Sequence, residues 1–174
     1  IAQVEVKPRT QVVGAFDGSD TDDWTGFRLQ TREGHQFTPT FPDGRPMVWD
    51  PAAHGGQVPR TEVSAGMAHI VETYDLLRFY ADPPYWESEI DAWAETYGEK
   101  VVIRWETYRL TQMHAAALRL HTDVTKADTA FAHDGDAQVA VMIRNARKLA
   151  RPGMRYVLGK PSQTQKIDGV ISSI

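Results

Sequence analysis

The order of its apolar segments constrains the fold of this chain more than any other feature of the sequence. Three short segments rich in aromatic and β-branched residues come first, at residues 11–17, 24–31 and 36–41. Short turns separate them, and the second turn carries the Glu33-Gly34 pair typical of hairpins. We therefore expect the first part of the chain to form three antiparallel strands that follow one another directly.

After a proline- and glycine-rich loop at residues 42–59, helical and extended patterns alternate. Apolar residues at helical spacing predict helices at residues 61–74, 86–97, 111–124 and 135–149, and a last helix from residue 166. Compact apolar runs predict strands at residues 76–81, 101–105 and 155–158. This order indicates an α/β fold, in which a mixed sheet (an antiparallel three-strand meander plus parallel strands) is flanked by helices. Among common folds, it matches the ribonuclease H-like fold.

Composition and missing motifs exclude several classes of protein. The 174 residues suit one domain, residues 1–174, and the lack of cysteine excludes a disulfide scaffold and a thiolate zinc site. Sequence motifs of serine hydrolases, of His-Glu-x-x-His zinc proteases and of P-loop proteins are missing. No apolar run approaches the roughly 18 residues of a membrane span. Because the chain opens without methionine, we expect a piece of a longer protein.

Three aspartates stand at the ends of expected elements. Asp17 closes the first strand, Asp82 follows the fourth, and Asp168 opens the last helix. Ligands of such sheets bind beyond the strand ends, where the loops of neighbouring strands meet. Clustered carboxylates repel one another unless a divalent cation offsets their charge, and their oxygen atoms suit Mg²⁺ or Mn²⁺. A pair of such ions can activate water for attack on a phosphodiester.

Spacing alone leaves a structural alternative open for each aspartate. Asp82 precedes two prolines and can simply end a strand, while Asp20 and Asp22 are interpreted as members of a solvated turn. Asp23 stands six residues after Asp17, where the second strand begins. Its carboxylate fits either the turn or the same metal cluster as Asp17.

Basic residues gather in one segment of the chain. Between residues 144 and 167 there are seven basic residues and no acidic one, which leaves 12 basic and 23 acidic residues elsewhere. A basic segment on an acidic body fits a protein that meets a polyanion on one face. On this feature alone a solvated helix face followed by a lysine-bearing loop is slightly favoured, because most charge runs are solvated faces. The residues are Arg144, Arg147, Lys148, Arg151, Arg155, Lys160 and Lys166.

Several short segments add a resemblance to a known family. They are Gly14-Ala-Phe-Asp-Gly-Ser19, Val58-Pro-Arg60, Tyr80-Ala-Asp-Pro-Pro-Tyr-Trp86, His133-Asp-Gly-Asp136 with Asn145-Ala-Arg147, and Gln165-Lys-Ile-Asp-Gly-Val170. In this order they resemble the large terminase subunits of tailed bacteriophages. The match runs from about residue 11 to the end of the chain and covers only the nuclease part of those proteins.

Large terminases join a packaging ATPase to a ribonuclease H-like nuclease, so the resemblance implies an isolated nuclease domain. By motif, the metal-binding aspartates of the family fall on Asp17, Asp82 and Asp168, with Asp23 as a candidate fourth ligand. The implied activity is cleavage of concatemeric viral double-stranded DNA, with two Mg²⁺ or Mn²⁺ ions and little sequence specificity. The implied partners are the ATPase domain of the same full-length chain, the small terminase subunit and the portal. The implied location is the host cytoplasm and, transiently, the viral procapsid.

The resemblance also implies that the basic segment contacts the DNA backbone. Arg144, Arg147 and Lys148 are expected on a helix, with Lys160 and Lys166 ahead of Asp168. Such phosphate contacts give an affinity that depends strongly on salt and little on sequence. One departure concerns Met142, because the family often has histidine three residues before its Asn-Ala-Arg motif. No role of that histidine is carried over to this chain.

Other functions remain as alternatives. A docking module of the packaging motor would keep the fold without cleaving DNA, and a Holliday-junction resolvase would share fold and metals but prefer another substrate. An actin-like phosphotransferase would share the Asp-Gly-Ser turn, but it needs a second glycine-rich loop and a larger chain. The loop at residues 42–59 is interpreted as a tolerated insertion rather than a lid over the site.

Overall fold

A mixed sheet forms the centre of the molecule. The computed structural model describes residues 5–174, so residues 1–4 of the expected 1–174 domain lie outside the described residues. The strand order is β6-β5-β1-β2-β3-β7, and a short β4 also pairs with β2. The strands are β1 Gln11–Asp17, β2 Thr25–Thr31, β3 His35–Phe37, β4 Val48–Trp49, β5 Asp75–Ala81, β6 Val102–Arg104 and β7 Ala132–His133. A separate hairpin pairs β8 Arg147–Arg151 with β9 Arg155–Gly159.

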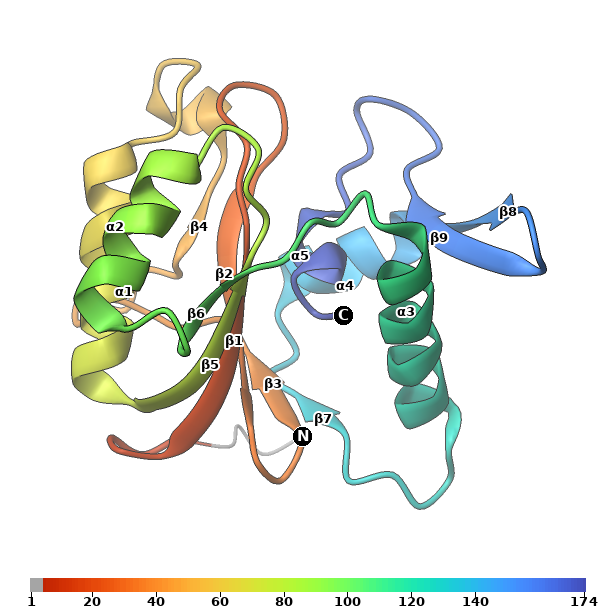
Figure 1. Cartoon of the computed structure of the whole chain (residues 1–174), viewed down its shortest axis with the longest axis horizontal. Coiled ribbons are helices and arrows are strands. Elements are labelled where there is room, and N and C mark those ends of the chain that lie inside the picture. Colours follow the sequence, from red (N-terminus) through yellow and green to blue (C-terminus); the bar gives the residue numbers. More distant parts are fainter. Residues whose placement is uncertain (1–4) are drawn as a thin grey trace.

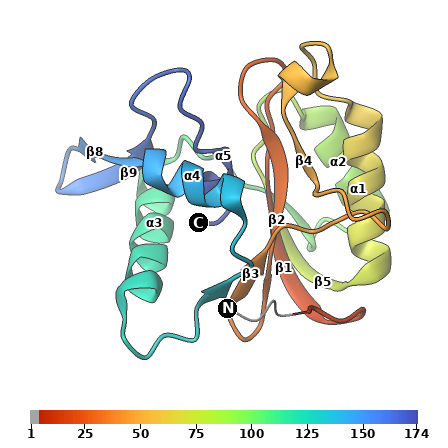
Figure 2. The same ribbon diagram turned by 180° about the vertical axis from the view of Figure 1, so that it is seen from behind.

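Helices lie on both sides of this sheet. Helices α1 and α2 cover one face, while α3, α4, α5 and the β8–β9 hairpin lie on the other side (Figures 1 and 2). The helices are α1 Arg60–Thr73, α2 Glu87–Tyr97, α3 Leu110–Thr125, α4 Ala137–Asn145 and α5 Asp168–Ile171, with a 3₁₀ turn η1 at Pro51–His54. Within residues 5–174, no helix combines the length and the apolar character that crossing a membrane requires.

The pairing of the strands confirms the ribonuclease H-like arrangement expected from the sequence. Strands β1, β2 and β3 form the antiparallel meander, and β5 and β6 join β1 in parallel on its other side. Along β1 the residues Val12, Gly14 and Phe16 are buried, while Val13 and Ala15 between them are more exposed. This alternation places the apolar face of β1 against the helices and fixes its register, since a slip by one residue would expose it.

The prediction of one helix over residues 135–149 is wrong for the second half of that range. Helix α4 ends at Asn145, and Arg147 and Lys148 lie on strand β8 instead of on a helix. The side-chain amide of Asn145 donates to the carbonyl of Lys166, 3.0 Å away, at the point where the helix stops. Beyond it the backbone pairs with β9, so the apolar spacing up to Leu149 continues by coincidence. Strands β4 and β7, of two residues each, are too short to show a period in the sequence.

Aromatic rings fill the core between the sheet and helices α1 and α2. The ring of Phe27 is fully buried, and its centroid lies 5.2 Å from that of Phe16 and 5.7 Å from that of Phe79. Trp49 and Trp93 complete its surroundings at 5.7 and 6.2 Å. The rings meet tilted or edge to face, which is the arrangement that aromatic pairs prefer. Strand β2 is thereby tied to β1, β4 and β5 and to α2.

Replacing Phe27 by alanine should therefore destabilise the protein strongly. We expect Phe27→Ala to lower the free energy of unfolding by about 3–5 kcal/mol, because the cavity left among four rings cannot collapse. Urea unfolding monitored by circular dichroism measures this change. As a control, Val141→Ala on α4, where the side chain is 47% exposed, should change it by less than about 0.5 kcal/mol. Equal effects of the two substitutions would contradict this account of the core.

Candidate active site

The parallel pairing of β1 and β5 brings Asp17 and Asp82 to the same edge of the sheet. Phe16 and Ala81 are partners in the register, so the residue after each is an aspartate at the same level. The backbone N–H of Asp82 donates to the carbonyl of Phe16 over 3.1 Å, which extends the pairing by one step. Both carboxylates thus emerge where the two strands end, as the sequence predicted. They line one cavity of about 180 Å³ between the sheet and α3.

The turn after Asp17 packs directly on the residues that follow Asp82. The ring of Trp86 lies over Gly18, where an added Cβ would come within 2.5 Å of the indole. The indole Nε1–H of Trp86 donates to the carbonyl of Ser19 over 3.2 Å. A larger residue than glycine cannot fit at this turn without moving the buried tryptophan. The segments at residues 14–19 and 80–86, which carry part of the family resemblance, therefore pack on each other beside Asp17 and Asp82.

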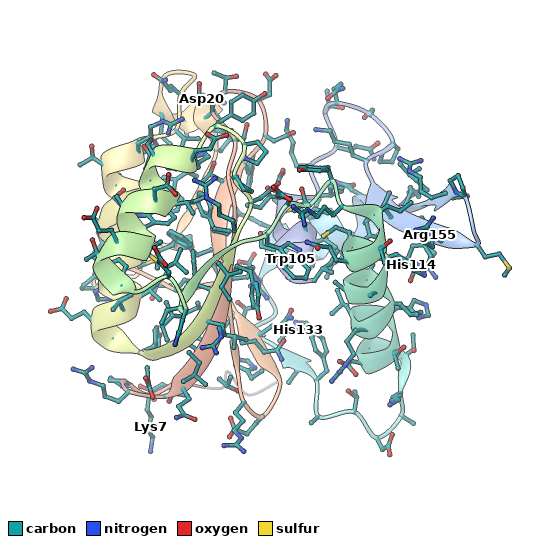
Figure 3. The ribbon with its side chains drawn as sticks, in the orientation of Figure 1. Lys7, Asp20, Trp105, His114, His133 and Arg155 are labelled. Atoms are coloured by element: carbon teal, nitrogen blue, oxygen red, sulfur yellow. The ribbon has the colours of Figure 1, made fainter. Side chains whose placement is uncertain are left out.

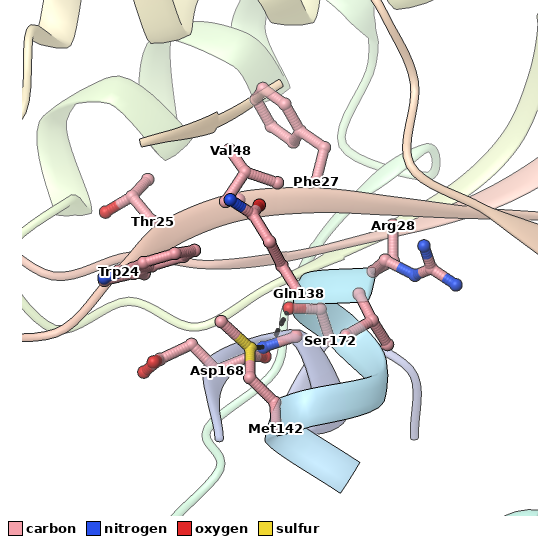
Figure 4. Close-up of a pocket in the computed structure, with 12 residues that line it drawn as sticks. Trp24, Thr25, Phe27, Arg28, Val48, Gln138, Met142, Asp168 and Ser172 are labelled. Atoms are coloured by element: carbon pink, nitrogen blue, oxygen red, sulfur yellow. Dashed lines mark hydrogen bonds between the residues drawn. The ribbon is translucent and has the colours of Figure 1, made fainter. Parts of the chain in front are cut away.

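The third aspartate comes from α5 and is positioned by α4. The N–H of Gly169 donates to the sulfur of Met142 over 3.0 Å, directly next to Asp168 (Figure 4). A Cβ at Gly169 would lie 2.9 Å from that sulfur and 3.2 Å from Val139, so the two helices are in close contact. Met142 stands where the resembling family often has histidine. In this chain its thioether holds the backbone beside a site aspartate, a role that the sequence analysis did not find.

A polar network ties the start of α4 to the sheet. Buried Arg28 on β2 donates to Asp134 over 3.0 Å and to Thr38 over 2.7 Å. The hydroxyl of Thr38 donates to Asp136, and the other oxygen of Asp136 accepts N–H groups of Gln138 and Val139. Asp136 is thereby the N-cap of α4. Arg28 itself was missed, because a single arginine in an apolar strand gives no signal of its partners.

Burial raises the pKa values of all three aspartates, and the charges of acidic neighbours add to the effect. Burial raises the pKa of Asp17 well above its ordinary value, and the charges of Asp168, Asp82 and Asp23 raise it further. Burial and then the charge of Asp23 raise the pKa of Asp168 to about 6. The pKa of Asp82 is raised by burial, although Thr107 opposes this by donating its N–H and hydroxyl to the carboxylate over 3.2 and 2.6 Å. Asp17 therefore lies within range of the charges of the other three aspartates.

The donor set of this cluster fits a hard divalent cation. Among the side chains described, the Oδ2 atom of Asp168 is buried without a hydrogen-bond partner. A buried, unpaired carboxylate oxygen is costly unless a cation or a donor meets it. Within residues 5–174, however, no three acidic or histidine side chains stand in a ready-made metal cage. The site thus offers converging oxygen ligands rather than a closed coordination sphere, which suits Mg²⁺ or Mn²⁺ more than zinc.

The structure places the fourth aspartate and two of the basic residues together. The ammonium group of Lys160 lies 2.7 Å from both oxygens of Asp23, and that of Lys166 lies 2.7 Å from Oδ1. These hydrogen bonds lower the pKa of Asp23 against the opposing effect of burial. Asp23 is thus near the other aspartates but already has cationic partners. Lys160 and Lys166 face the site rather than open solvent.

The remaining basic residues lie on or next to the β8–β9 hairpin, which projects from the body of the molecule (Figure 1). Arg144, Arg147 and Lys148 are exposed, and the Lys148 ammonium lies 4.8 Å from the ring centroid of Tyr156. The hairpin rests on α3, where the N–H of Tyr156 donates to His114 over 3.1 Å (Figure 3). It presents a basic surface on the side of the sheet that carries Asp168.

Comparison with solved structures identifies the fold. The chain superposes on the large terminase of bacteriophage HK97 with a TM-score of 0.70, at 15% identity, over 97% of this chain and 39% of that one. The chain has the fold of a large terminase nuclease domain. The large terminase nuclease of thermophilic phage G20c, solved with bound magnesium, gives a TM-score of 0.61 at 13% identity, over 96% of this chain and 82% of that one.

Sequence comparison gives a relative from a bacteriophage as well. The Gene 13 protein of Mycobacterium phage D29 is 25% identical over 169 residues, which cover 91% of this chain. The chain spans 27% of the length of that relative, so most of the relative lies outside the region compared. No protein-family model matches the chain.

The raised pKa of Asp168 has a consequence for stability in the absence of metal. Because its native pKa of about 6 exceeds the ordinary value of about 3.9, the native state binds more protons than the unfolded state between these values. The free energy of unfolding must then fall as pH rises through this window. Asp168→Asn removes the effect and should stabilise the metal-free protein at about pH 7.5 by up to about 3 kcal/mol.

Urea unfolding in EDTA at several pH values measures this difference. Wild type and Asp168→Asn should approach each other in stability near about pH 4.5, where most of the wild-type carboxyl is protonated. A difference that stays constant from acid to neutral pH would show that Asp168 does not carry the proton.

Proposed function

We propose that this chain is the nuclease domain of a large terminase and cleaves double-stranded DNA with the help of divalent metal ions. The observation that carries the proposal is the meeting of Asp17 and Asp82 where β1 and β5 end, with Asp168 of α5 close enough for its charge to raise the pKa of Asp17. The shared fold with large terminase nucleases supports it, as does the presence of magnesium in the G20c structure. Sequence-independent cleavage of concatemeric viral DNA during packaging is the corresponding role.

The three aspartates would hold the metal, Mg²⁺ or Mn²⁺. When bound, a divalent ion supplies a water of lowered pKa and offsets the negative charge that develops on the phosphate. Asp82 is held in a fixed orientation by two donors of Thr107, and Asp168 has a free buried oxygen for a ligand. Asp17 is close enough to both for their negative charges to raise its pKa. The resemblance of the sequence to large terminases implies two such ions.

The β8–β9 hairpin and the end of α4 would bind the DNA backbone. Arg144, Arg147 and Lys148 are exposed and their charges have no acidic partner among the described side chains. A hairpin that projects from the body can reach a duplex lying across the site. Contacts of this kind hold DNA without reading its sequence.

The wider assembly follows from the same proposal. In the full-length protein the nuclease would be joined to an ATPase domain, and it would work with a small terminase subunit and the portal. It would act in the host cytoplasm and, transiently, on the procapsid. A packaging motor feeds DNA past the nuclease, so cleavage needs no sequence choice of its own.

Plasmid cleavage tests the activity and its site together. We expect the protein to nick and linearise supercoiled plasmid in Mn²⁺ or Mg²⁺ and to be inactive in EDTA. Because even outer-shell partners of metal ligands typically contribute about 10- to 100-fold, Asp82→Asn should lower the rate by about 100-fold or more. The control is Asp75→Asn at the opposite end of the same strand, which should leave the rate unchanged.

Each other outcome points to a different function. Cleavage that survives Asp82→Asn would place the nuclease elsewhere or trace it to a contaminant. A protein that binds DNA but never cleaves it, with any divalent metal, would favour the docking module. Strong preference for a four-way junction over linear duplex would favour a resolvase.

DNA binding tests the hairpin separately. The double substitution Arg147→Glu/Lys148→Glu should weaken binding to a random duplex and make log Kd less dependent on log salt by about one to two units of slope. Fluorescence anisotropy across a salt series measures both quantities.

The control has the same change in charge at the other end of the molecule. Lys7 and Arg9 are exposed, and Lys7 lies away from the hairpin (Figure 3), with Arg9 two residues further along the chain. Lys7→Glu/Arg9→Glu should shift Kd slightly and leave the salt slope unchanged. If both double variants lose the same affinity, only overall charge matters and the hairpin has no special role.

A further inference from the structure

Three charged side chains form a compact cluster beside the aspartates, which we call the Asp23 cluster: Asp23, Lys160 and Lys166. Lys160 contacts both carboxylate oxygens at 2.7 Å. Lys166 contacts Oδ1 at 2.7 Å and also donates to the carbonyl of Asp22 over 2.5 Å. All three side chains are mostly buried, with exposed fractions of 31%, 24% and 22% in the order named. Ion pairs with this degree of burial are screened by solvent much less than surface pairs.

The carboxylate of Asp23 is therefore largely occupied. Each of its oxygens accepts at least one charged N–H group, and Oδ1 accepts two. To serve as a metal ligand, Asp23 would have to release at least one lysine and leave its ammonium group half-buried without a partner. Breaking a partly buried ion pair in this way costs free energy that a surface pair would not.

Lys160 also acts on the aspartates that it does not touch. Its charge lowers the pKa values of Asp17 and Asp168, opposite to the effect that the acidic neighbours have on them. The ammonium group thus lies within electrostatic reach of three carboxylates at once.

The net charge of the site also leaves room for a single divalent ion. When ionised, Asp17, Asp82, Asp168 and Asp23 carry four negative charges, and the two lysines offset half of them. One divalent ion neutralises the remainder. Glu106, which also faces Asp82, does not change this balance because it pairs with Arg109. A second divalent ion would have to enter beside two ammonium groups, and like charges at that range repel strongly.

We propose that Lys160 and Lys166 take the place of a second divalent ion, so that this site binds one metal ion per chain. The inference rests on the proposed function and deepens it. Asp17, Asp82 and Asp168 would hold the ion, and Asp23 would hold the lysines instead of a metal. The ammonium group of Lys160 supplies the positive charge on the other side of the site, where it faces a DNA phosphate.

Counting bound metal tests this proposal without any measure of cleavage. Native mass spectrometry and isothermal titration calorimetry with Mn²⁺ alone should give one ion for the wild type. In Lys160→Ala/Lys166→Ala the carboxylate of Asp23 is released and a second ion should bind, which raises the count from one to two. Lys160→Ala alone serves if the double variant does not fold, and it should raise the count in the same direction.

Two controls separate a local effect from a general loss of positive charge. Lys160→Arg keeps the charge and the pairing and should still bind one ion. Lys126→Ala removes a lysine at the end of α3, away from the cluster, and should also bind one.

The outcomes also distinguish this inference from the proposed function. Two ions of similar affinity in the wild type would overturn the inference and leave a metal-dependent nuclease intact. One ion in the wild type and still one in both lysine variants would overturn it too. No Mn²⁺ bound by the wild type at all would overturn both the inference and the function on which it rests.

Discussion

The site depends first on the parallel pairing of β1 with β5. This pairing sets Phe16 opposite Ala81. The residues that follow them, Asp17 and Asp82, are therefore held next to each other at the ends of the two strands. A slip by one residue would turn the buried side of β1 outward and carry Asp17 away from Asp82. The aromatic core under these strands prevents the slip, because Phe16, Phe27 and Phe79 interlock across three strands. The same packing that stabilises the protein thus sets the distance between its acidic groups.

Much of the architecture could be read from the sequence because it rests on local periodicity. The meander, helices α1 to α3 and strands β5 and β6 all show clear apolar patterns, and their bounds agree with the expected ones within a few residues. The hairpin β8–β9 could not be predicted in the same way. Leu149 continues the spacing of α4, while the side-chain bond of Asn145 that ends the helix reaches a residue far along the chain. Long-range contacts of this kind leave no periodic trace.

The site shows the same division. The three aspartates stand at element ends, which is a local property, and their convergence follows from topology. The partners that decide their chemistry come from elsewhere: Thr107 for Asp82, Met142 for the backbone next to Asp168, and two lysines for Asp23. The basic segment was interpreted as one surface, but the structure divides it. Lys160 and Lys166 turn inward to an aspartate, whereas Arg147 and Lys148 remain exposed on the hairpin.

The contact between Met142 and Gly169 has a consequence for how this protein changes over evolution. The sulfur and the glycine stand so close that any side chain at position 169 needs a smaller or displaced residue at position 142. Because α5 is four residues long and also packs on β1 and β2, it cannot move freely to absorb such a change. The constraint runs in one direction: glycine at position 169 leaves position 142 free to change, whereas a side chain at position 169 needs room from position 142. If Met142 is replaced, the N–H of Gly169 needs another hydrogen-bond acceptor to hold the backbone next to Asp168 in the same position.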